Sequence, residues 1–194
     1  TVTSPANFVG LSSIILTTND GGASGAGIAG EDSNEILINW AAVNDPPVNT
    51  VPGGQTIAEE GSVVFAGQAL AVDDIDGPTT LVQVTLSATG GTLSLGTPGA
   101  VSFTNGDGAG DAAMTFSGTL SALGTALANT VFTANANFAG TATVTMVSND
   151  LGNSGTGGAR QDTDSVTITV TGVNDAPVNS MPANQFATED IVLA

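Results

Sequence analysis

The sequence predicts an all-β protein made of antiparallel β-sandwich repeats in tandem, with one short helix near residues 121–128. Three observations lead to this prediction. Polar and apolar residues alternate with a period of two in several segments, which is typical of a strand with one face on a core. Such segments recur about every ten residues, separated by glycine, asparagine and aspartate, as in β-sandwiches. Part of the sequence also occurs twice, which indicates repeated modules.

The internal repeat has a constant spacing of 130 positions. The sequence Val-Asn-Asp-Pro-Pro-Val-Asn at 43–49 returns as Val-Asn-Asp-Ala-Pro-Val-Asn at 173–179. At the same spacing Asn-Phe-x-Gly recurs at 7–10 and 137–140, Asn-Asp at 19–20 and 149–150, and aspartate at 32 and 162. A period of this length has the size of a domain. We therefore expect residues 1–43 to be the C-terminal part of one module, 44–173 a complete module, and 174–194 the linker and first strand of the next, within a longer tandem array.

The expected strands follow one another along the chain. In the first part they are 11–18 and 35–40, and in the complete module they are 57–58, 63–65, 81–86, 92–95, 100–103, 113–117, 131–133, 142–147 and 165–171. Gly61 separates the first two strands of the complete module. The helix is predicted because Leu120, Leu123 and Leu127 have helical spacing near Ser121, a possible N-cap. We expect it to cross one end of the sandwich.

The composition excludes several classes of function. The chain has 18 acidic residues against one basic residue, Arg160, and a formal net charge of −17. Such a surface repels phosphate backbones and anionic membranes, so we expect no nucleic-acid partner. There is no cysteine, and no apolar run reaches the length of a membrane helix, so we expect no direct membrane insertion. The lack of Lys, His and Tyr, with abundant Gly, Thr and Asp, is typical of secreted acidic repeat proteins of bacteria.

Catalysis is not expected. Without His, Cys, Tyr or Lys, acid–base chemistry would rest on Asp and Glu alone, and the sequence contains no activated nucleophile pair. A glycosidase with two carboxylates is formally possible. However, the carboxylates lie in glycine-rich loops and linkers, with no aromatic residues around them to bind sugar. We therefore predict that the protein is not an enzyme.

The acidic segments resemble a known family. Asn44-Asp45-Pro46-Pro47, Glu59-Glu60 and Asp74-Ile75-Asp76 are similar to the calcium-binding set of cadherin repeats, which has an Asn-Asp linker, a Glu on the first strand and an Asp-x-Asp after the second. The spacings from the linker, about 15 and 30 positions, are also similar. Residues 132–155 and 162–170 resemble still more closely the bacterial cadherin-like repeats of giant secreted adhesins, some of which are of the chondroitin-sulfate-proteoglycan type. This likeness covers the whole chain.

The resemblance implies a Greek-key sandwich of the cadherin/Ig type, with calcium bound between successive repeats at the bacterial cell surface or outside the cell. Calcium takes six to eight oxygen ligands at about 2.3–2.6 Å, which two domains together can offer. In the family topology Asn44, Asp45, Asp74, Asp76 and Asp150 would converge where the linker enters, and Glu60, Asn174 and Asp175 would serve the following junction. The full set of predicted calcium ligands is Asp20, Asp32, Asn44, Asp45, Glu59, Glu60, Asp73, Asp74, Asp76, Asp150, Asp162, Asp164, Asn174, Asp175, Glu189 and Asp190.

These segments also have plainer interpretations. Asn-Asp-Pro-Pro is typical of an extended linker, because proline restricts the residue before it. Residues 73–78 and 150–152 are typical of turns, and the remaining acids can be solvated. The chain lacks an Asp-Arg-Glu-like segment before the late strands, where cadherins supply further ligands, so the number of ions per junction stays open. Residues 105–111 resemble one turn of a calcium nonapeptide repeat, which needs stacked copies, so a hairpin loop is favoured there. For Trp40, packing in the core or at an interface is favoured over stacking on a sugar.

The leading hypothesis for function is a non-catalytic structural repeat of a large extracellular bacterial adhesin or surface fibre, stiffened by Ca²⁺ and partnered by neighbouring repeats of the same chain. One alternative is a module that binds a glycan or a protein through its loops. A threonine-rich face that binds ice or mineral is another. A further alternative is the subunit of a polymerising filament, in which incomplete ends pair with other copies. The final segment, about 20 residues long, is too short to replace the missing part of the first module.

Overall fold

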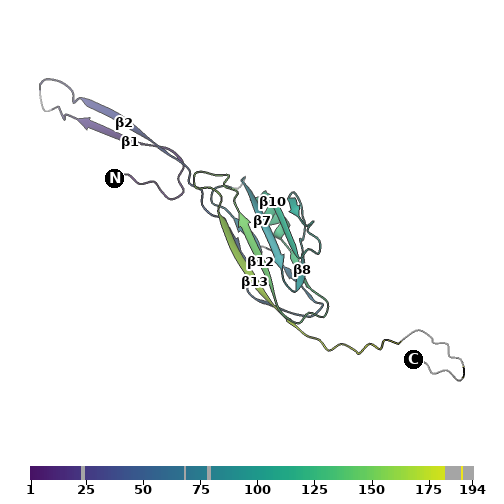
Figure 1. Cartoon of the computed structure of the whole chain (residues 1–194). Coiled ribbons are helices and arrows are strands. Elements are labelled where there is room, and N and C mark those ends of the chain that lie inside the picture. Colours follow the sequence, from purple (N-terminus) through teal and green to yellow (C-terminus); the bar gives the residue numbers. More distant parts are fainter. Residues whose placement is uncertain (23–24, 68, 78–79, 182–188, 190–194) are drawn as a thin grey trace.

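The structure is a computed structural model that describes residues 1–22, 25–67, 69–77, 80–181 and 189. Three parts follow one another along an elongated molecule (Figure 1). A two-stranded hairpin lies at the N-terminal end, a β-sandwich in the middle, and an extended C-terminal segment leaves the sandwich at the opposite end.

The N-terminal hairpin has the same strand pairing as the last two strands of the sandwich. It consists of β1 (Gly10–Asn19) and β2 (Glu31–Trp40), and Gly10 faces Trp40. In the sandwich, β12 (Gly140–Asn149) pairs with β13 (Gln161–Thr171), and Gly140 faces Val170. Both pairs are antiparallel, and equivalent residues are 130 positions apart. The sequence repeat is therefore also a repeat of structure.

The sandwich is formed by the remaining strands together with β12 and β13. They are β3 (Val48–Thr50), β4 (Gln55–Ala58), β5 (Ser62–Phe65), β6 (Ala71–Asp73), β7 (Leu81–Ala88), β8 (Gly91–Ser94), β9 (Ser102–Asn105), β10 (Ala113–Thr119) and β11 (Thr130–Ala134). The large sheet has the order β4-β13-β12-β7-β10-β9, the smaller sheet has the order β5-β11-β8, and β3 pairs with β6.

The strand order confirms the predicted all-β sandwich. Neighbours in the sheets are mostly not consecutive in the chain, because the chain often crosses between the two sheets. It does so between β4 and β5, β7 and β8, β8 and β9, β10 and β11, and β11 and β12. This is a Greek-key type of connection. All pairs are antiparallel except β4, which lies parallel to β13. That single parallel pair departs from the purely antiparallel prediction.

The core lies between the two sheets and follows the predicted alternation. Along β12, Ala142, Val144 and Met146 are buried, while the threonines between them face outward. Large side chains from both sheets fill the interior, including Phe65, Phe116, Phe132, Leu86, Leu93, Met114 and Ile168. Alternate burial of this kind is the main source of stability in a two-sheet domain.

The helix forms as predicted but begins differently. Helix α1 (Leu120–Leu127) continues directly from β10, and it buries Leu123 and Leu127 against β10 and β6. Its N-cap is Thr119, whose Oγ1 accepts a hydrogen bond of 3.3 Å from the Ala122 N–H. The prediction of a serine cap at Ser121 was wrong, because Thr119 is the last residue with an extended backbone. The short strands β3 and β6 were not predicted.

The N-terminal hairpin leaves its apolar residues in solvent. In the sandwich, β12 and β13 are flanked by β7 and β4, whereas no described strand pairs with either edge of the hairpin. Ile14, Leu16 and Ile36 stand at the positions of core residues of β12 and β13 but remain exposed. No helix in the described part of the chain is long and apolar enough to cross a bilayer.

Candidate cation-binding junction

The linker enters the sandwich against the loop between β12 and β13, residues 150–160. Val43 forms a parallel bridge with Thr156, and the Asn44 N–H donates to the Thr156 carbonyl at 2.8 Å. We call this end of the sandwich, with Asn44, Asp45, Asp73, Asp74, Asp76 and Asp150, the junction tip. It is the end at which β13 begins and at which the hairpin is attached (Figure 1).

Asn44 fastens the linker to this loop with its side chain. It is 1% exposed. Its Nδ2 donates to Asp150 Oδ2 at 2.6 Å and to the Gly158 carbonyl at 2.9 Å, and its Oδ1 accepts from Ser154 Oγ at 2.8 Å. Both N–H groups of the amide, and one of the two acceptor positions of its oxygen, are thus directed into the loop. Asn44 acts as an anchor of the linker, and its oxygen is already engaged.

Gly155 shows how closely the linker passes the loop. It has φ +61°, and a Cβ built on it would lie 2.7 Å from the Ala42 carbonyl carbon and 2.8 Å from the Val43 carbonyl carbon. Contacts under 3.0 Å at a Cβ require the backbone to shift. The loop therefore needs a glycine here both for its conformation and for the linker that lies against it.

Asp150 is a buried anchor of the same loop. It is 3% exposed, and its Oδ1 accepts from the N–H groups of Gly152 and Arg160, each at 2.8 Å. Burial disfavours the charged form of Asp150. The two N–H groups, the Asn44 amide and the Arg160 charge outweigh burial and hold the pKa of Asp150 below its usual value. Asp150 is thus an ionised carboxylate whose oxygens are already engaged by N–H donors.

The negative charge of the Asp73–Asp76 segment is less well compensated than that of Asp150. Asp74 is 5% exposed, and its Oδ1 accepts from the Asp76 N–H at 2.9 Å. Burial raises the pKa of Asp74, the Asp76 N–H opposes this, and the charges of Asp76, Asp150 and Asp73 raise it further. Asp76 Oδ2 accepts from the Asp45 N–H at 2.7 Å, which ties this segment to the linker.

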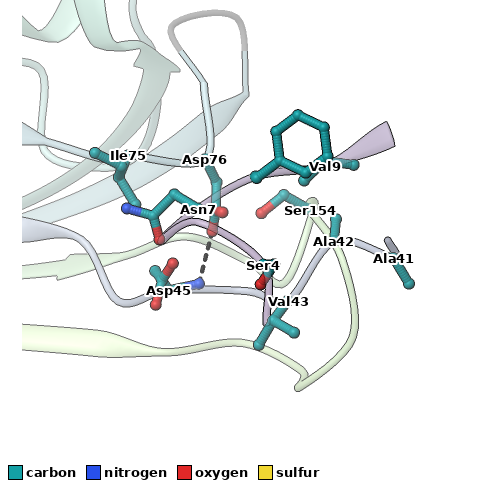
Figure 2. A pocket seen from close by; sticks show the side chains of 11 residues that line it. Ser4, Asn7, Val9, Ala41, Ala42, Val43, Asp45, Ile75, Asp76 and Ser154 are labelled. Atoms are coloured by element: carbon teal, nitrogen blue, oxygen red, sulfur yellow. Dashed lines mark hydrogen bonds between the residues drawn. The ribbon is translucent and has the colours of Figure 1, made fainter. Parts of the chain in front are cut away.

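A pocket of about 310 Å³ lies between this segment and the base of the hairpin (Figure 2). Asp45 and Asp76 line it from the sandwich side. Ser4 and Asn7, which precede β1, line it from the hairpin side. Oxygen atoms from two consecutive parts of the chain therefore face one space, which is the kind of environment that a hard cation prefers.

The donor set fits calcium in kind but is incomplete in number. The described residues contain no group of three or more acidic side chains that already surround one metal position. Asp150 and one oxygen each of Asp74 and Asp76 already accept N–H groups. The Asp45 carboxylate, the remaining oxygens of Asp74 and Asp76, and the Asn7 amide are oxygen donors that suit Ca²⁺, with water or further residues completing its shell.

Four other predicted ligands lie on or beside the first and last strands. Asp20 and Asp32 are at the far end of the hairpin from the junction tip. Asp162 Oδ2 accepts from the Asn49 N–H at 2.7 Å and so connects β13 to β3. Asp164 stands two residues further along β13, opposite Met146. The structure thus places Asp20 and Asp32 away from the cluster around Asp74, whereas Asp162 is bound to β3, the strand that pairs with the strand ending at Asp73.

The predicted ligands of the following junction lie at the opposite end of the sandwich. Glu59 and Glu60 form the turn between β4 and β5, and the Glu59 carboxylate accepts from the Val173 N–H, at the start of the outgoing linker. Asn174 and Asp175 follow directly and are exposed. Glu189 is exposed as well, and Asp190 lies outside the described residues.

Several residues of the junction were not singled out from the sequence. Asn7 lines the pocket, Ser154 binds Asn44, and Asn49 binds Asp162. Each has an identical counterpart 130 positions away, at Asn137, Ser24 and Asn179, so the repeat contained a signal for them. Asn49 Oδ1 and Ser148 Oγ are buried without a partner in the described structure.

Two further residues behave as structural groups. The Trp40 indole N–H donates to Ser12 Oγ at 2.7 Å across the hairpin. Asp111 Oδ2 accepts from the N–H groups of Asp107 and Gly108, at 3.0 and 2.8 Å, within the β9–β10 loop. This loop belongs to an ordinary β-hairpin, as the sequence favoured.

Comparison with known proteins adds a loose similarity of fold. No family model and no curated protein matches the chain. Among solved structures, mouse cadherin-23 EC22-24 shares 17% identity over 84% of this chain, with a TM-score of 0.36. Human mucin-like protocadherin EC1-2 shares 13% identity over 82% of this chain, with a TM-score of 0.32. The chain spans 43% of the cadherin-23 structure and 69% of the protocadherin structure. Because both scores are low, the fold assignment rests on the strand pairing.

Proposed function

We propose that the chain is a non-catalytic structural repeat of a large extracellular adhesin or surface fibre of bacteria, in which calcium bound at the junctions stiffens the array. One observation carries the proposal: the buried Asp74 carboxylate lies among the charges of Asp76, Asp150 and Asp73. Arg160 is the only basic side chain of the whole chain, and its charge acts on Asp150. A cation that balances the charge around Asp74 would therefore come from solution.

A cation in the pocket beside this cluster would join three parts of the molecule. Asp74 and Asp76 belong to the sandwich, Asp45 to the linker, and Asn7 to the segment that leads into the hairpin. An ion held by oxygens from all three would fix the angle between the hairpin and the sandwich. It would also offset the repulsion among the carboxylates, so that binding and stability are linked.

The same arrangement supports a repeating role. Glu59 contacts the outgoing linker at Val173, and Asn174-Asp175 repeats the Asn44-Asp45 of the incoming linker. Each module would thus offer acidic groups at both of its ends, and neighbouring modules would share the ions between them. The composition supports an extracellular setting, where calcium is abundant and an acidic surface stays soluble.

Melting and scattering experiments test the proposal. The chain is compared in chelator and in about 1 mM calcium, a concentration suited to extracellular calcium modules. Calcium should raise the melting temperature and narrow the distribution of shapes in small-angle X-ray scattering. Identical melting curves and scattering profiles with and without calcium would contradict the proposal.

Matched variants locate the ion. The double variant Asp45→Asn/Asp76→Asn keeps amide oxygens in place but removes two charges, so the calcium-induced rise should be largely lost. Asp107→Asn is the control, because Asp107 lies in the β9–β10 loop, away from the junction tip. If both variants respond to calcium like the unmodified chain, the ion binds elsewhere.

A further inference from the structure

The interior of the sandwich contains two polar side chains whose oxygens are not engaged by the described part of the chain. Asn49 is 9% exposed, and Ser148 is fully buried. Asn49 Oδ1 and Ser148 Oγ are buried atoms without a hydrogen-bond partner among the described residues. A buried polar atom without a partner is costly, and most such atoms are bonded to protein groups or to an ordered water. These two oxygens therefore call for a ligand.

The two side chains come from different strands and face the same interior. Asn49 is the middle residue of β3, and it is buried while its neighbours Val48 and Thr50 are exposed. Ser148 lies on β12, on the same buried face as the core residue Met146. Because alternate residues of a strand share one face, Asn49 and Ser148 both point into the sandwich and away from its surface.

Hydrogen bonds and strand register place both oxygens in one small region, next to Asp162. The Asn49 N–H donates to Asp162 Oδ2 at 2.7 Å, and Asn49 Nδ2 donates to the Met146 carbonyl at 3.4 Å. Ser148 stands directly opposite Asp162 in the β12–β13 ladder. Side chains of opposite residues lie on one face of a sheet, about 5 Å apart. Asn49, Ser148 and Asp162 therefore surround one position between β3, β12 and β13.

These three groups complement a single water molecule. Asn49 Oδ1 only accepts hydrogen bonds, whereas the Ser148 hydroxyl can donate. Each oxygen of Asp162 accepts one N–H, from Thr163 at Oδ1 and from Asn49 at Oδ2, and each has a second lone pair. A water that donates to Asn49 Oδ1 and to Asp162, and accepts from the Ser148 hydroxyl, makes about three hydrogen bonds, the usual number for a buried water.

We propose that one water molecule is bound between Asn49, Ser148 and Asp162 as an integral part of the sandwich. It joins β3, the first strand after the linker, to β12 and β13. Asn44 fastens the linker itself to Asp150, which follows Ser148 by two residues. The linker and the strand that continues it are thus both held at the end of β12. This second attachment does not depend on the calcium proposed above.

The internal repeat contains the same three kinds of group. At a spacing of 130 positions, the counterparts of Asn49, Ser148 and Asp162 are Asn179, Thr18 and Asp32. Thr18 stands opposite Asp32 in the β1–β2 ladder, as Ser148 stands opposite Asp162. Threonine in place of serine keeps the hydroxyl that the water contacts. The chemistry of the site therefore recurs with the sequence repeat.

Crystal structures of the full chain, at a resolution that shows ordered water, test the site directly. One crystal is grown in chelator and one in calcium. Both should show the same density peak, about 2.5–3.0 Å from Asn49 Oδ1, Ser148 Oγ and an oxygen of Asp162. A peak present only in calcium, with oxygens at about 2.3–2.6 Å, would identify a cation and overturn the proposal. A direct bond between Asn49 Oδ1 and Ser148 Oγ, with no peak, would overturn it as well.

The sign of a change in melting temperature tests the water in solution. In chelator, Ser148→Ala should melt about 4 °C lower than the original chain, because it loses a buried hydrogen bond to the water. If the hydroxyl had no partner, alanine would remove a desolvated polar group, and an unchanged or higher melting temperature would contradict the proposal. Ser165→Ala, on the exposed face of β13, is the control and should melt within about 2 °C of the original. If Ser148→Ala does not fold, the crystal structures of the unmodified chain decide.

Discussion

Replacement of Asn44 by alanine should destabilise the sandwich strongly, although Asn44 lies in a linker and not in the apolar core. Its side chain is buried and makes three hydrogen bonds, at 2.6 Å to the Asp150 carboxylate, at 2.9 Å to the Gly158 carbonyl and at 2.8 Å from Ser154. Alanine removes all three at once. It also leaves Asp150 Oδ2 buried without this donor, although Asp150 remains ionised.

The size of the effect follows from these bonds. A hydrogen bond to a charged group contributes about 1.5–3 kcal/mol and a neutral one about 0.5–1.5 kcal/mol. One charged and two neutral bonds give a loss of about 4 kcal/mol. A domain of this kind is stable by about 5–15 kcal/mol, so Asn44→Ala should remove a large part of the free energy of unfolding.

Denaturant unfolding followed by far-ultraviolet circular dichroism measures this loss. It is done in chelator, so that calcium binding does not contribute. The matched control is Asn174→Ala, the same residue at the equivalent position of the repeat, exposed and outside the sandwich. At low protein concentration this variant should unfold within about 0.5 kcal/mol of the original chain. A loss below about 1 kcal/mol for Asn44→Ala, or equal losses for both variants, would refute the anchoring role of Asn44.

Three further predictions concern the same tip. Asp74→Asn removes one of the clustered charges but keeps an oxygen that can accept from the Asp76 N–H, so in chelator it should raise the melting temperature. In calcium the gain should shrink or reverse, because a proposed ligand is weakened. Thermal melts in both conditions measure this, and a lower melting temperature in chelator would contradict it. The free energy of unfolding should depend on pH with two opposite slopes, one from Asp74 and one from Asp150. The folded pKa of Asp74 is raised, so the folded state keeps this proton to higher pH, and stability falls as pH rises from the usual value of 3.8 through the raised pKa. The folded pKa of Asp150 is lowered, so its contribution is present above 3.8 and is lost as pH falls from 3.8 through the lowered pKa. Denaturant titrations between about pH 3 and 7 should therefore show the first slope flattened in Asp74→Asn and the second in Asp150→Asn, and unchanged slopes would contradict the assignment. Gly155→Ala should destabilise the sandwich by about 2 kcal/mol more than Gly158→Ala, because both glycines have positive φ but only Gly155 lies against the linker backbone; equal losses in thermal unfolding would show that the linker does not press on this loop.

The strands that could be predicted from the sequence are those with a long alternating pattern. Leu11 to Thr18 and Ser165 to Thr171 lie in β1 and β13, and their period of two also indicated which face is buried in β13. The exposure of the equivalent face in β1 could not be predicted, since burial depends on strands far away in the chain. The three-residue strands β3 and β6 are too short to show any period. The parallel pairing of β4 with β13 is a contact across more than a hundred residues, which no local pattern records.

The candidate site was predictable in composition but not in its division of roles. The resemblance to cadherin repeats implied that Asn44, Asp45, Asp74, Asp76 and Asp150 converge, and the structure places all five at one tip. Sequence alone treats them as equivalent oxygen donors. The hydrogen bonds separate them, because Asn44 and Asp150 are occupied by each other and by loop N–H groups. Such a division depends on local backbone geometry, which residue identities do not specify.

If calcium binds at the tip as proposed, the two classes of carboxylate there should respond differently to its removal. Asp150 and its counterpart Asp20 both have pKa values lowered with backbone N–H groups on their oxygens, and both hold loops that recur with the repeat. The Asp150 and Asp20 carboxylates are thus already stabilised by N–H donors of their own loops. Asp74 has a raised pKa among like charges, and its neighbours Ile75 and Asp76 line the pocket between the hairpin and the sandwich. Loss of calcium should therefore act through Asp74 and Asp45 and free the angle of the hairpin, while Asn44 keeps the linker fastened to the loop. An array built from such modules would become flexible at its junctions without any module unfolding.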